Sequence, residues 1–266
     1  LYRRKLGASR AAKVFDRDNG EISLGTVLGT KNINTEVNAK MPLLSFLAIN
    51  YSIPVIVEVI RWFEECIIRN YANPLAEQQI LLSDDDVSKK QFITMMNDMG
   101  IGISGYRFDN QSSEFYLQRT LHDVLYELPF SSESDGTRKL FAALPVILMA
   151  LKEGRLVVVD ELDAKLHPKL LRYVIRLFTN REINKNGAQL LFTSHDMSTM
   201  KNSIFRRDEI WFAALDEENS SIIYSLSELR KENNDPINNT AAYDKQYLEG
   251  RYGADPYLKN MLSWEV

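Results

Sequence analysis

The stretch that decides the fold reads Leu156-Val157-Val158-Val159-Asp160-Glu161. Four consecutive apolar residues, three of them β-branched, predict a strand that is buried on both faces, as in the middle of a parallel sheet. Ligands of open α/β sheets bind outside the carboxyl ends of the strands. At that edge Asp160 is placed to help hold Mg²⁺, and Glu161 to polarise a water molecule. The alternative interpretation is a strand that simply runs into an acidic turn.

A second strand of the same kind follows after one helix. Pro168 is placed to begin a helix over residues 169–180, and residues 188–193 read as another buried strand that ends in Ser194-His195-Asp196. A strand, a helix and a strand in this order form a βαβ unit, whose parallel strands bring their polar ends to one edge. A histidine at a strand end is by itself more often structural, but here we expect His195 to lie beside Glu161.

The segment before the first strand predicts an anion site. Ser131-Ser132-Glu133-Ser134-Asp135-Gly136-Thr137 introduces an apolar helix over residues 139–151, which ends at Lys152-Glu153-Gly154 in the usual basic and then glycine order. A serine, a glycine and a threonine at a helix N-terminus offer amides, hydroxyls and the positive end of the helix dipole to an anion. Taken alone, the same residues are equally explained as a plain N-cap.

Composition sets broad limits on the function. The chain has 266 residues, of which 45% are hydrophobic, and a net charge of −4, so nothing in its overall charge either favours or excludes nucleic acid. The single cysteine, Cys66, cannot form an intramolecular disulfide, and its apolar neighbours predict a buried thiol in a reducing compartment, the cytoplasm. No apolar run reaches the length of a membrane span, and the first residues lack the apolar core of a signal peptide.

The first half of the chain predicts three kinds of element. Two short strands flank Asn19-Gly20 as an edge hairpin, apolar residues at helical spacing over 41–71 predict two helices broken at Pro54, and a second hairpin is expected over residues 105–117. We therefore expect an α/β fold with edge strands over 1–35, a helical and hairpin insertion over 36–120, and the core over 121–266. Residues 25–32 lack the Gly-Lys-Ser/Thr ending of a phosphate loop, and no such loop occurs elsewhere in the chain.

Four motifs in order resemble the signature, Walker B, D-loop and switch-histidine series of ABC-type ATPases: residues 133–137, 156–161, 163–168 and 193–196. The match is closest to the AAA-type ATP-binding proteins of bacterial abortive-infection and antiphage operons, relatives of the SMC and RecF group. Residues 247–254, Tyr-Leu-Glu-Gly-Arg-Tyr-Gly-Ala, resemble the usual ending of that group. The strong motifs cover residues 133–196, and weaker likeness runs back to about residue 40 and on to 257.

The resemblance implies a P-loop NTPase fold of the ABC-ATPase head type, with ATP and Mg²⁺ bound at the interface of a head-to-tail dimer. Asp160 would then bind Mg²⁺, Glu161 would be the catalytic base, and His195 would contact the γ-phosphate. Asp163 would communicate across the dimer. The signature residues Ser134, Asp135, Gly136 and Thr137 would act on the nucleotide held by the other subunit, and His167 is expected to be a structural residue of the D-loop.

Two features depart from the family pattern. Asp135 stands where transporters usually have glycine, which puts an extra carboxylate near the γ-phosphate. The phosphate loop, which the family places near its N-terminus, is missing, so we expect it to precede Leu1 in the natural protein, and expect this chain by itself to bind ATP poorly.

The resemblance also implies a function in defence. We expect an ATPase whose dimerisation controls an effector encoded in the same operon, such as a TOPRIM- or RloB-like nuclease. One alternative is a repair or chromosome-maintenance ATPase that clamps DNA with a basic helix face; the candidates for that face are Lys165, Lys169, Arg172 and Arg176, which are equally explained as a solvated surface. The other alternative is a nucleotide-bound scaffold with low turnover.

Overall fold

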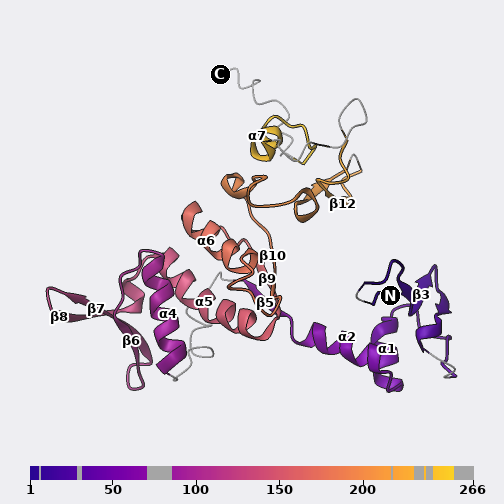
Figure 1. Ribbon diagram of the computed structural model, residues 1–266, viewed down its shortest axis with the longest axis horizontal. Helices are drawn as coiled ribbons and strands as arrows, with labels where there is room; N and C mark the ends of the chain where they lie inside the picture. The colour runs from indigo at the N-terminus through magenta and orange to yellow at the C-terminus, as the bar shows by residue number, and fades with distance from the viewer. Residues whose placement is uncertain are drawn as a thin grey trace. The chain divides into compact units, whose positions relative to one another are not determined.

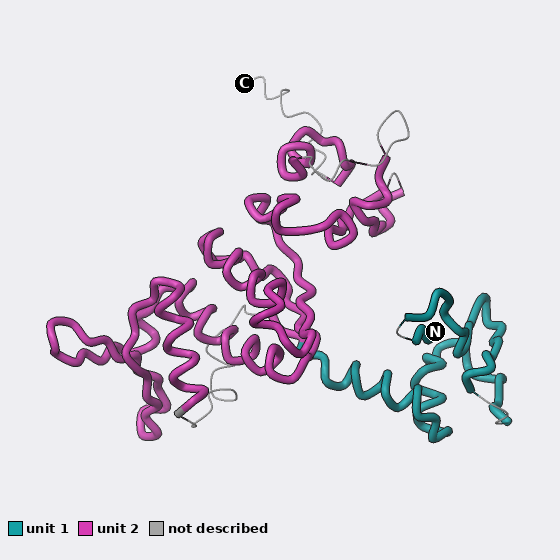
Figure 2. Tube along the Cα trace, viewed as in Figure 1, with its two compact units in different colours: residues 1–67 teal, residues 68–266 magenta. Residues whose placement is uncertain are grey.

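The chain divides into two compact units. The computed structural model describes residues 1–5, 7–28, 32–70, 86–216, 218–230, 237 and 242–254. Residues 1–67 form the first unit and residues 68–266 the second, as the two colours of Figure 2 show. Figure 1 labels helices and strands of each unit where there is room. This division differs from the three parts expected from the sequence, of which the boundary at 35/36 lies inside the first unit.

Short strands and two helices make up the first unit. Its elements are β1 (Tyr2–Arg3), β2 (Ala12–Lys13), β3 (Phe15–Asp18), β4 (Glu21–Leu24), the 3-10 helix η1 (Thr26–Leu28), α1 (Leu43–Asn50) and α2 (Pro54–Glu64). β3 and β4 form the predicted antiparallel hairpin, and its turn residues Asn19 and Gly20 both have positive φ, as the Asn-Gly pair predicts. Residues 29–31 of the rejected phosphate loop lie outside the described residues.

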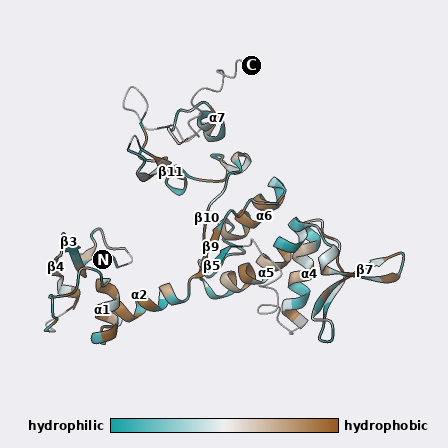
Figure 3. Cartoon of the chain, turned by 180° about the vertical axis from the view of Figure 1, so that it is seen from behind, coloured by the Kyte–Doolittle hydropathy of each residue, from teal (hydrophilic) through white to brown (hydrophobic). Residues whose placement is uncertain are grey.

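The first unit has a hydrophobic core of its own. It is formed by Val14, Leu28, Ile33, Leu43, Leu47, Ile53 and Ile56. The predicted break between the two helices at Pro54 is confirmed, because Pro54 is the first residue of α2, a position where its missing N–H costs no hydrogen bond. Both helices are rich in hydrophobic residues (Figure 3). No single helix of the described residues is long and apolar enough to cross a membrane; α1 and α2 pass that test only as a pair, bent by 117°.

The predicted end of the second helix, near residue 71, is wrong. The chain leaves the helix at Glu64 and forms a strand, β5 (Ile67–Asn70), which lies next to β9 in a sheet of order β10-β9-β5. Cys66, expected to be a buried thiol, is only half-buried, and its Sγ lies 3.2 Å from the carbonyl oxygen of Trp62.

A three-stranded antiparallel sheet and two helices form one part of the second unit. They are α4 (Asp86–Asp98), β6 (Gly105–Asp109), β7 (Glu114–Leu121), β8 (Val124–Pro129), the 3-10 helix η3 (Phe130–Ser132) and α5 (Asp135–Glu153). The hairpin of β6 and β7 is as predicted. β8 was not predicted, and Val124 pairs with Leu121, so the boundary expected at 120/121 falls inside a second hairpin.

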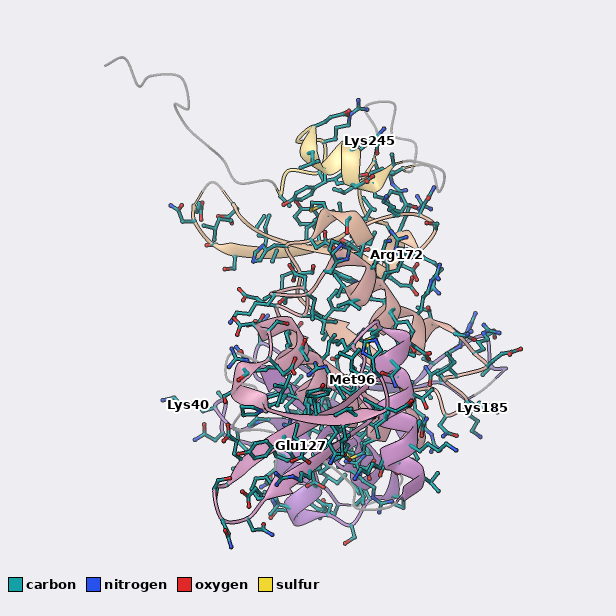
Figure 4. All side chains as sticks on the ribbon, turned by 90° about the vertical axis from the view of Figure 1, so that its left-hand side faces the viewer. Lys40, Met96, Glu127, Arg172, Lys185 and Lys245 are labelled. Carbon is teal, nitrogen blue, oxygen red and sulfur yellow. The ribbon has the colours of Figure 1, made fainter. Side chains whose placement is uncertain are left out.

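Aromatic rings join this sheet to the helices. Phe141 of α5 lies 5.0 Å from Phe92 of α4, 5.6 Å from Tyr106 of β6 and 5.0 Å from Phe130, measured between ring centroids. Met96 of α4 is fully buried, whereas Glu127 lies on β8 (Figure 4). This packing fixes the position of α5, whose N-terminus belongs to the candidate site.

The predicted βαβ unit is confirmed. β9 (Leu156–Asp160) and β10 (Gln189–Phe192) pair in parallel, with Leu156 opposite Gln189 and Val159 opposite Phe192. The helix between them, α6 (Pro168–Thr179), begins at its proline as expected. It buries one apolar side, formed by Leu171, Val174, Ile175 and Leu177.

The C-terminal part has a separate hydrophobic cluster. After the short 3-10 helices η4 (Met197–Thr199) and η5 (Arg207–Glu209), β11 (Trp211–Leu215) and β12 (Ser221–Ser225) form a hairpin, and α7 (Tyr243–Leu248) follows. Phe212 stacks on Tyr247 with ring centroids 5.8 Å apart, and the hydroxyl of Tyr224 donates to the carbonyl oxygen of Tyr252. The family-like ending over 247–254 therefore packs on the hairpin.

Candidate active site

The carboxyl ends of β9 and β10 stay paired one residue beyond the strands. The Thr193 amide donates to the carbonyl oxygen of Val159 at 3.1 Å, and the Leu162 amide donates to the carbonyl oxygen of Thr193 at 3.1 Å. Asp160 and Glu161 therefore leave the sheet directly beside the start of the Ser194-His195-Asp196 segment. This is the shared edge that the βαβ pattern predicted.

The hydroxyl of Thr193 links the two acidic residues. It donates to Oδ1 of Asp160 at 2.6 Å and accepts a hydrogen bond from the Glu161 amide at 2.7 Å. One side chain thereby orients the Asp160 carboxylate and fixes the backbone of Glu161. Sequence reasoning included Thr193 in the switch-histidine motif over residues 193–196 but gave its hydroxyl no role.

Glu161 and His195 come together at this edge. His195 Nε2 lies 4.0 Å from Glu161 Oε1, and the two side chains are 88% and 61% exposed. The predicted proximity of the two residues is therefore found, and both side chains face outward. Glu161 has a φ of 49°, in the left-handed region that non-glycine residues seldom adopt. Such backbone strain is common where a functional side chain has to be aimed.

Asp163 joins the turn after β9 to the segment after β10. Its Oδ2 accepts a hydrogen bond from the His195 amide at 3.2 Å. Its Oδ1 is buried and has no hydrogen-bond partner among the described residues. Asp163 therefore holds the backbone that carries His195.

The predicted anion site lies at the start of α5. Ser134 is the N-cap, and its Oγ accepts a hydrogen bond from the Thr137 amide at 3.2 Å and lies 2.9 Å from the Thr137 hydroxyl. A Cβ on Gly136 would lie 2.7 Å from the carbonyl oxygen of Lys165. Only glycine therefore lets this end of the helix approach the turn after β9, which is the D-loop of the resemblance.

Asp135 is held by two cations. Lys165 Nζ lies 2.9 Å from Asp135 Oδ2, and Arg138 pairs with Oδ1. The hydrogen bond from Lys165 lowers the pKa of Asp135 most, and the hydrogen bond from Arg138 lowers it further. The carboxylate that departs from the transporter pattern therefore carries its own counterions, and it ties the helix start to the D-loop.

Lys139 is a residue of the site that sequence reasoning missed. Its Nζ donates to the carbonyl oxygens of Glu161 at 2.6 Å and Ala164 at 3.0 Å. Burial lowers the pKa of its amine, and the nearby carboxylates of Asp163 and Glu161 act in the opposite direction.

His167 makes a structural contact, and the basic candidates on and near α6 differ in their exposure. His167 caps α6, where its Nδ1 accepts a hydrogen bond from the Lys169 amide at 3.2 Å, in line with the structural role expected for it. Among the basic candidates on and near α6, Lys169 and Arg176 are exposed. Arg172, labelled in Figure 4, is half-buried.

The acidic residues fit a magnesium nucleotide better than a closed metal site. The described residues contain no group of three or more His, Cys, Asp or Glu side chains that could hold a metal ion. Mg²⁺ is usually held by one or two carboxylates together with phosphate oxygens and water. Asp160 suits that pattern because Thr193 orients its carboxylate through one oxygen at the edge where ligands of parallel sheets bind.

Comparison with known proteins finds one family. Residues 42–201 match the family model described as "AAA domain, putative AbiEii toxin, Type IV TA system". The match spans 160 of the 266 residues, and it includes α5, both strands of the βαβ unit and the segment with His195. No curated protein matches the chain.

Proposed function

The chain belongs to this family of AAA domains, and we propose that it is part of an ATPase that hydrolyses ATP between two head-to-tail copies and thereby controls a defence effector. The observation that carries the proposal is the 4.0 Å approach of His195 to Glu161 at the shared edge of two parallel strands. Family membership supports an ATPase, and the family description names a toxin–antitoxin system.

Each residue at the edge has a chemical task in this proposal. Glu161 accepts the proton of the attacking water, as a solvent-facing carboxylate can. His195 donates a hydrogen bond to the γ-phosphate and helps to orient that water. Mg²⁺ bound with ATP would neutralise charge on the phosphates, and Asp160, oriented by Thr193, would hold it.

The start of α5 completes the site from the other copy. Ser134, Gly136 and Thr137 present a hydroxyl-lined helix N-terminus, which suits a phosphate. Asp135 does not add net negative charge there, because Lys165 and Arg138 pair with it. The proposal thus assigns a site with a catalytic part in one copy and an anion-binding part in the second.

The test is ATP hydrolysis by the full-length protein that contains this chain. Wild-type protein, Glu161→Gln and the control Glu182→Gln, which changes an exposed glutamate away from the edge, are compared in Mg²⁺ and ATP, with oligomer size recorded. We expect Glu161→Gln to lose turnover by at least about 100-fold and to retain an ATP-dependent dimer, and Glu182→Gln to behave as wild type. Equal turnover in all three proteins would refute the catalytic role of Glu161.

The same preparations separate the two alternatives. A DNA clamp predicts salt-sensitive binding of duplex DNA that weakens when exposed Lys169 and Arg176 are both replaced with glutamine. A low-turnover scaffold predicts an ATP-dependent dimer with no hydrolysis in the wild-type protein.

A further inference from the structure

Lys139 is buried in an unusual way. Its side chain lies on the second turn of α5, only 4% of the residue is exposed, and it is the one charged residue in the buried class among the described residues. Its ammonium group donates to two backbone carbonyl oxygens, those of Glu161 and Ala164. Buried lysines are rare because removing the charge from water costs free energy.

The two carbonyl groups belong to one turn. The Ala164 amide donates to the Glu161 carbonyl at 3.1 Å, so Lys139 binds a turn that is already closed. The residues at its two ends, Glu161 and Lys165, both have positive φ, 49° and 65°. A turn of non-glycine residues in the left-handed region persists only when its surroundings hold it.

The contact fixes the turn relative to the helix. Glu161 O is bound by Lys139, and the Glu161 amide is bound by the hydroxyl of Thr193. The peptide groups on both sides of the Glu161 Cα are therefore held by side chains from two other elements. The direction of the Glu161 side chain follows from that backbone, because the side chain itself is 61% exposed.

We propose that Lys139 is a positioning residue for Glu161: it fixes the turn that sets the direction of the catalytic carboxylate. The inference rests on the proposed ATPase function, and it adds a residue that acts through the backbone of the turn, by its hydrogen bonds to the Glu161 and Ala164 carbonyl oxygens. A lysine that only filled space in the core would support the fold without affecting the turn in particular.

The test uses Lys139→Met, Lys139→Arg and the matched control Lys152→Met in the full-length protein. Lys152 is an exposed lysine in the last turn of the same helix. Steady-state hydrolysis gives kcat and KM, and hydrogen exchange without nucleotide gives the protection of amides 161–166. Exchange is read at Ala164 and Leu166, whose amides donate within the turn.

We expect Lys139→Met to lower kcat by about 10- to 100-fold, the usual cost of a misplaced catalytic group, with KM within about twofold of the wild-type value. Exchange should rise at the turn and not across the rest of α5. Lys139→Arg should recover most of kcat because a guanidinium also donates to carbonyl oxygens, and Lys152→Met should match the wild type.

Two results would overturn the inference: unchanged kcat and turn protection in Lys139→Met, or faster exchange throughout α5 in proportion to the lost activity, which indicates a role in the core only. If the wild-type protein does not hydrolyse ATP, the proposed function fails. Hydrogen exchange then still decides whether Lys139 fixes the turn.

Discussion

Replacing Gly136 with alanine tests whether the site depends on the close approach of the start of α5 to the turn after β9. The added Cβ would lie 2.7 Å from the carbonyl oxygen of Lys165, where real Cβ contacts almost never come below 3.0 Å. The obstacle is backbone, which cannot turn aside as a flexible side chain can. The helix start or the turn that ends at Lys165 must therefore move by roughly half an ångström.

Two effects on stability oppose each other in this variant. Alanine is a better helix former than glycine by up to about 1 kcal/mol, whereas overpacking at a rigid contact costs about 1–3 kcal/mol. We expect the contact to dominate, with a net loss of about 1 kcal/mol. Because Lys139 joins the same turn to the same helix, the shift should reach Glu161 and lower kcat about tenfold.

The measurement compares Gly136→Ala with Gly102→Ala in the full-length protein. A Cβ on Gly102 would meet nothing within 4 Å, so this control adds the same methyl group at a place where it makes no contact. Hydrolysis rates and thermal unfolding are recorded, with hydrogen exchange over 161–166 without nucleotide. The exchange readout matters because Gly136 also belongs to the proposed anion site, and a loss of activity alone would not identify the D-loop as its cause. Wild-type exchange in the turn, together with raised stability, would refute the reasoning.

Two further predictions concern single hydrogen-bonded side chains. Thr193→Val leaves the Glu161 amide and the Asp160 carboxylate without their shared hydroxyl; we expect a loss of about 1 kcal/mol in stability and about tenfold in kcat, and rates equal to wild type would contradict the linking role. Burial raises the pKa of Tyr252 from 10.0 to about 12, so its contribution to stability is complete below pH 10 and is lost as the pH rises toward 12, by about 3 kcal/mol at most. Urea unfolding at pH 8 and pH 11 should show about half of that loss, ~1.4 kcal/mol, in the wild type and a smaller loss in Tyr252→Phe; equal losses would contradict it.

The parts of the fold that the sequence predicted correctly carry local signals. The β-branched run over 156–159 and the apolar run over 188–193 each identify a buried strand without knowledge of the partner. Pro168 marks the first residue of the helix between them. Parallel pairing and the proximity of Glu161 and His195 then follow from the order of elements.

The strands that were missed lack such signals. β5 (Ile67–Asn70) directly follows a helix, its apolar residues continue the helical spacing, and its neighbour β9 lies almost ninety residues later. β8 (Val124–Pro129) is exposed at every residue except its last, and its sequence, Val-Leu-Tyr-Glu-Leu-Pro, does not alternate between apolar and polar residues. In both cases pairing with a neighbouring strand of the sheet outweighs the local pattern.

The sequence predicted the carboxylates of the site better than the residues that hold those carboxylates and their backbone in place. Asp160 and Glu161 stand out because acidic residues seldom end a buried strand. Lys139 gives no comparable signal, since a lysine on a helix normally predicts a solvated face. The ion pair of Asp135 with Lys165 joins residues thirty positions apart, a contact that helical or strand periodicity does not encode.

The division of the chain into two compact units has a thermodynamic consequence. Residues 1–67 bury their own cluster around Val14, Leu47 and Ile56, whereas the rings around Phe141 belong to the second unit. A chain with two such units need not unfold in one cooperative step, and a single midpoint then describes neither unit. Gly136 and Tyr252 both lie in the second unit, so a melt of each variant tests whether the transition of residues 1–67 stays at its wild-type temperature when only the second unit is changed.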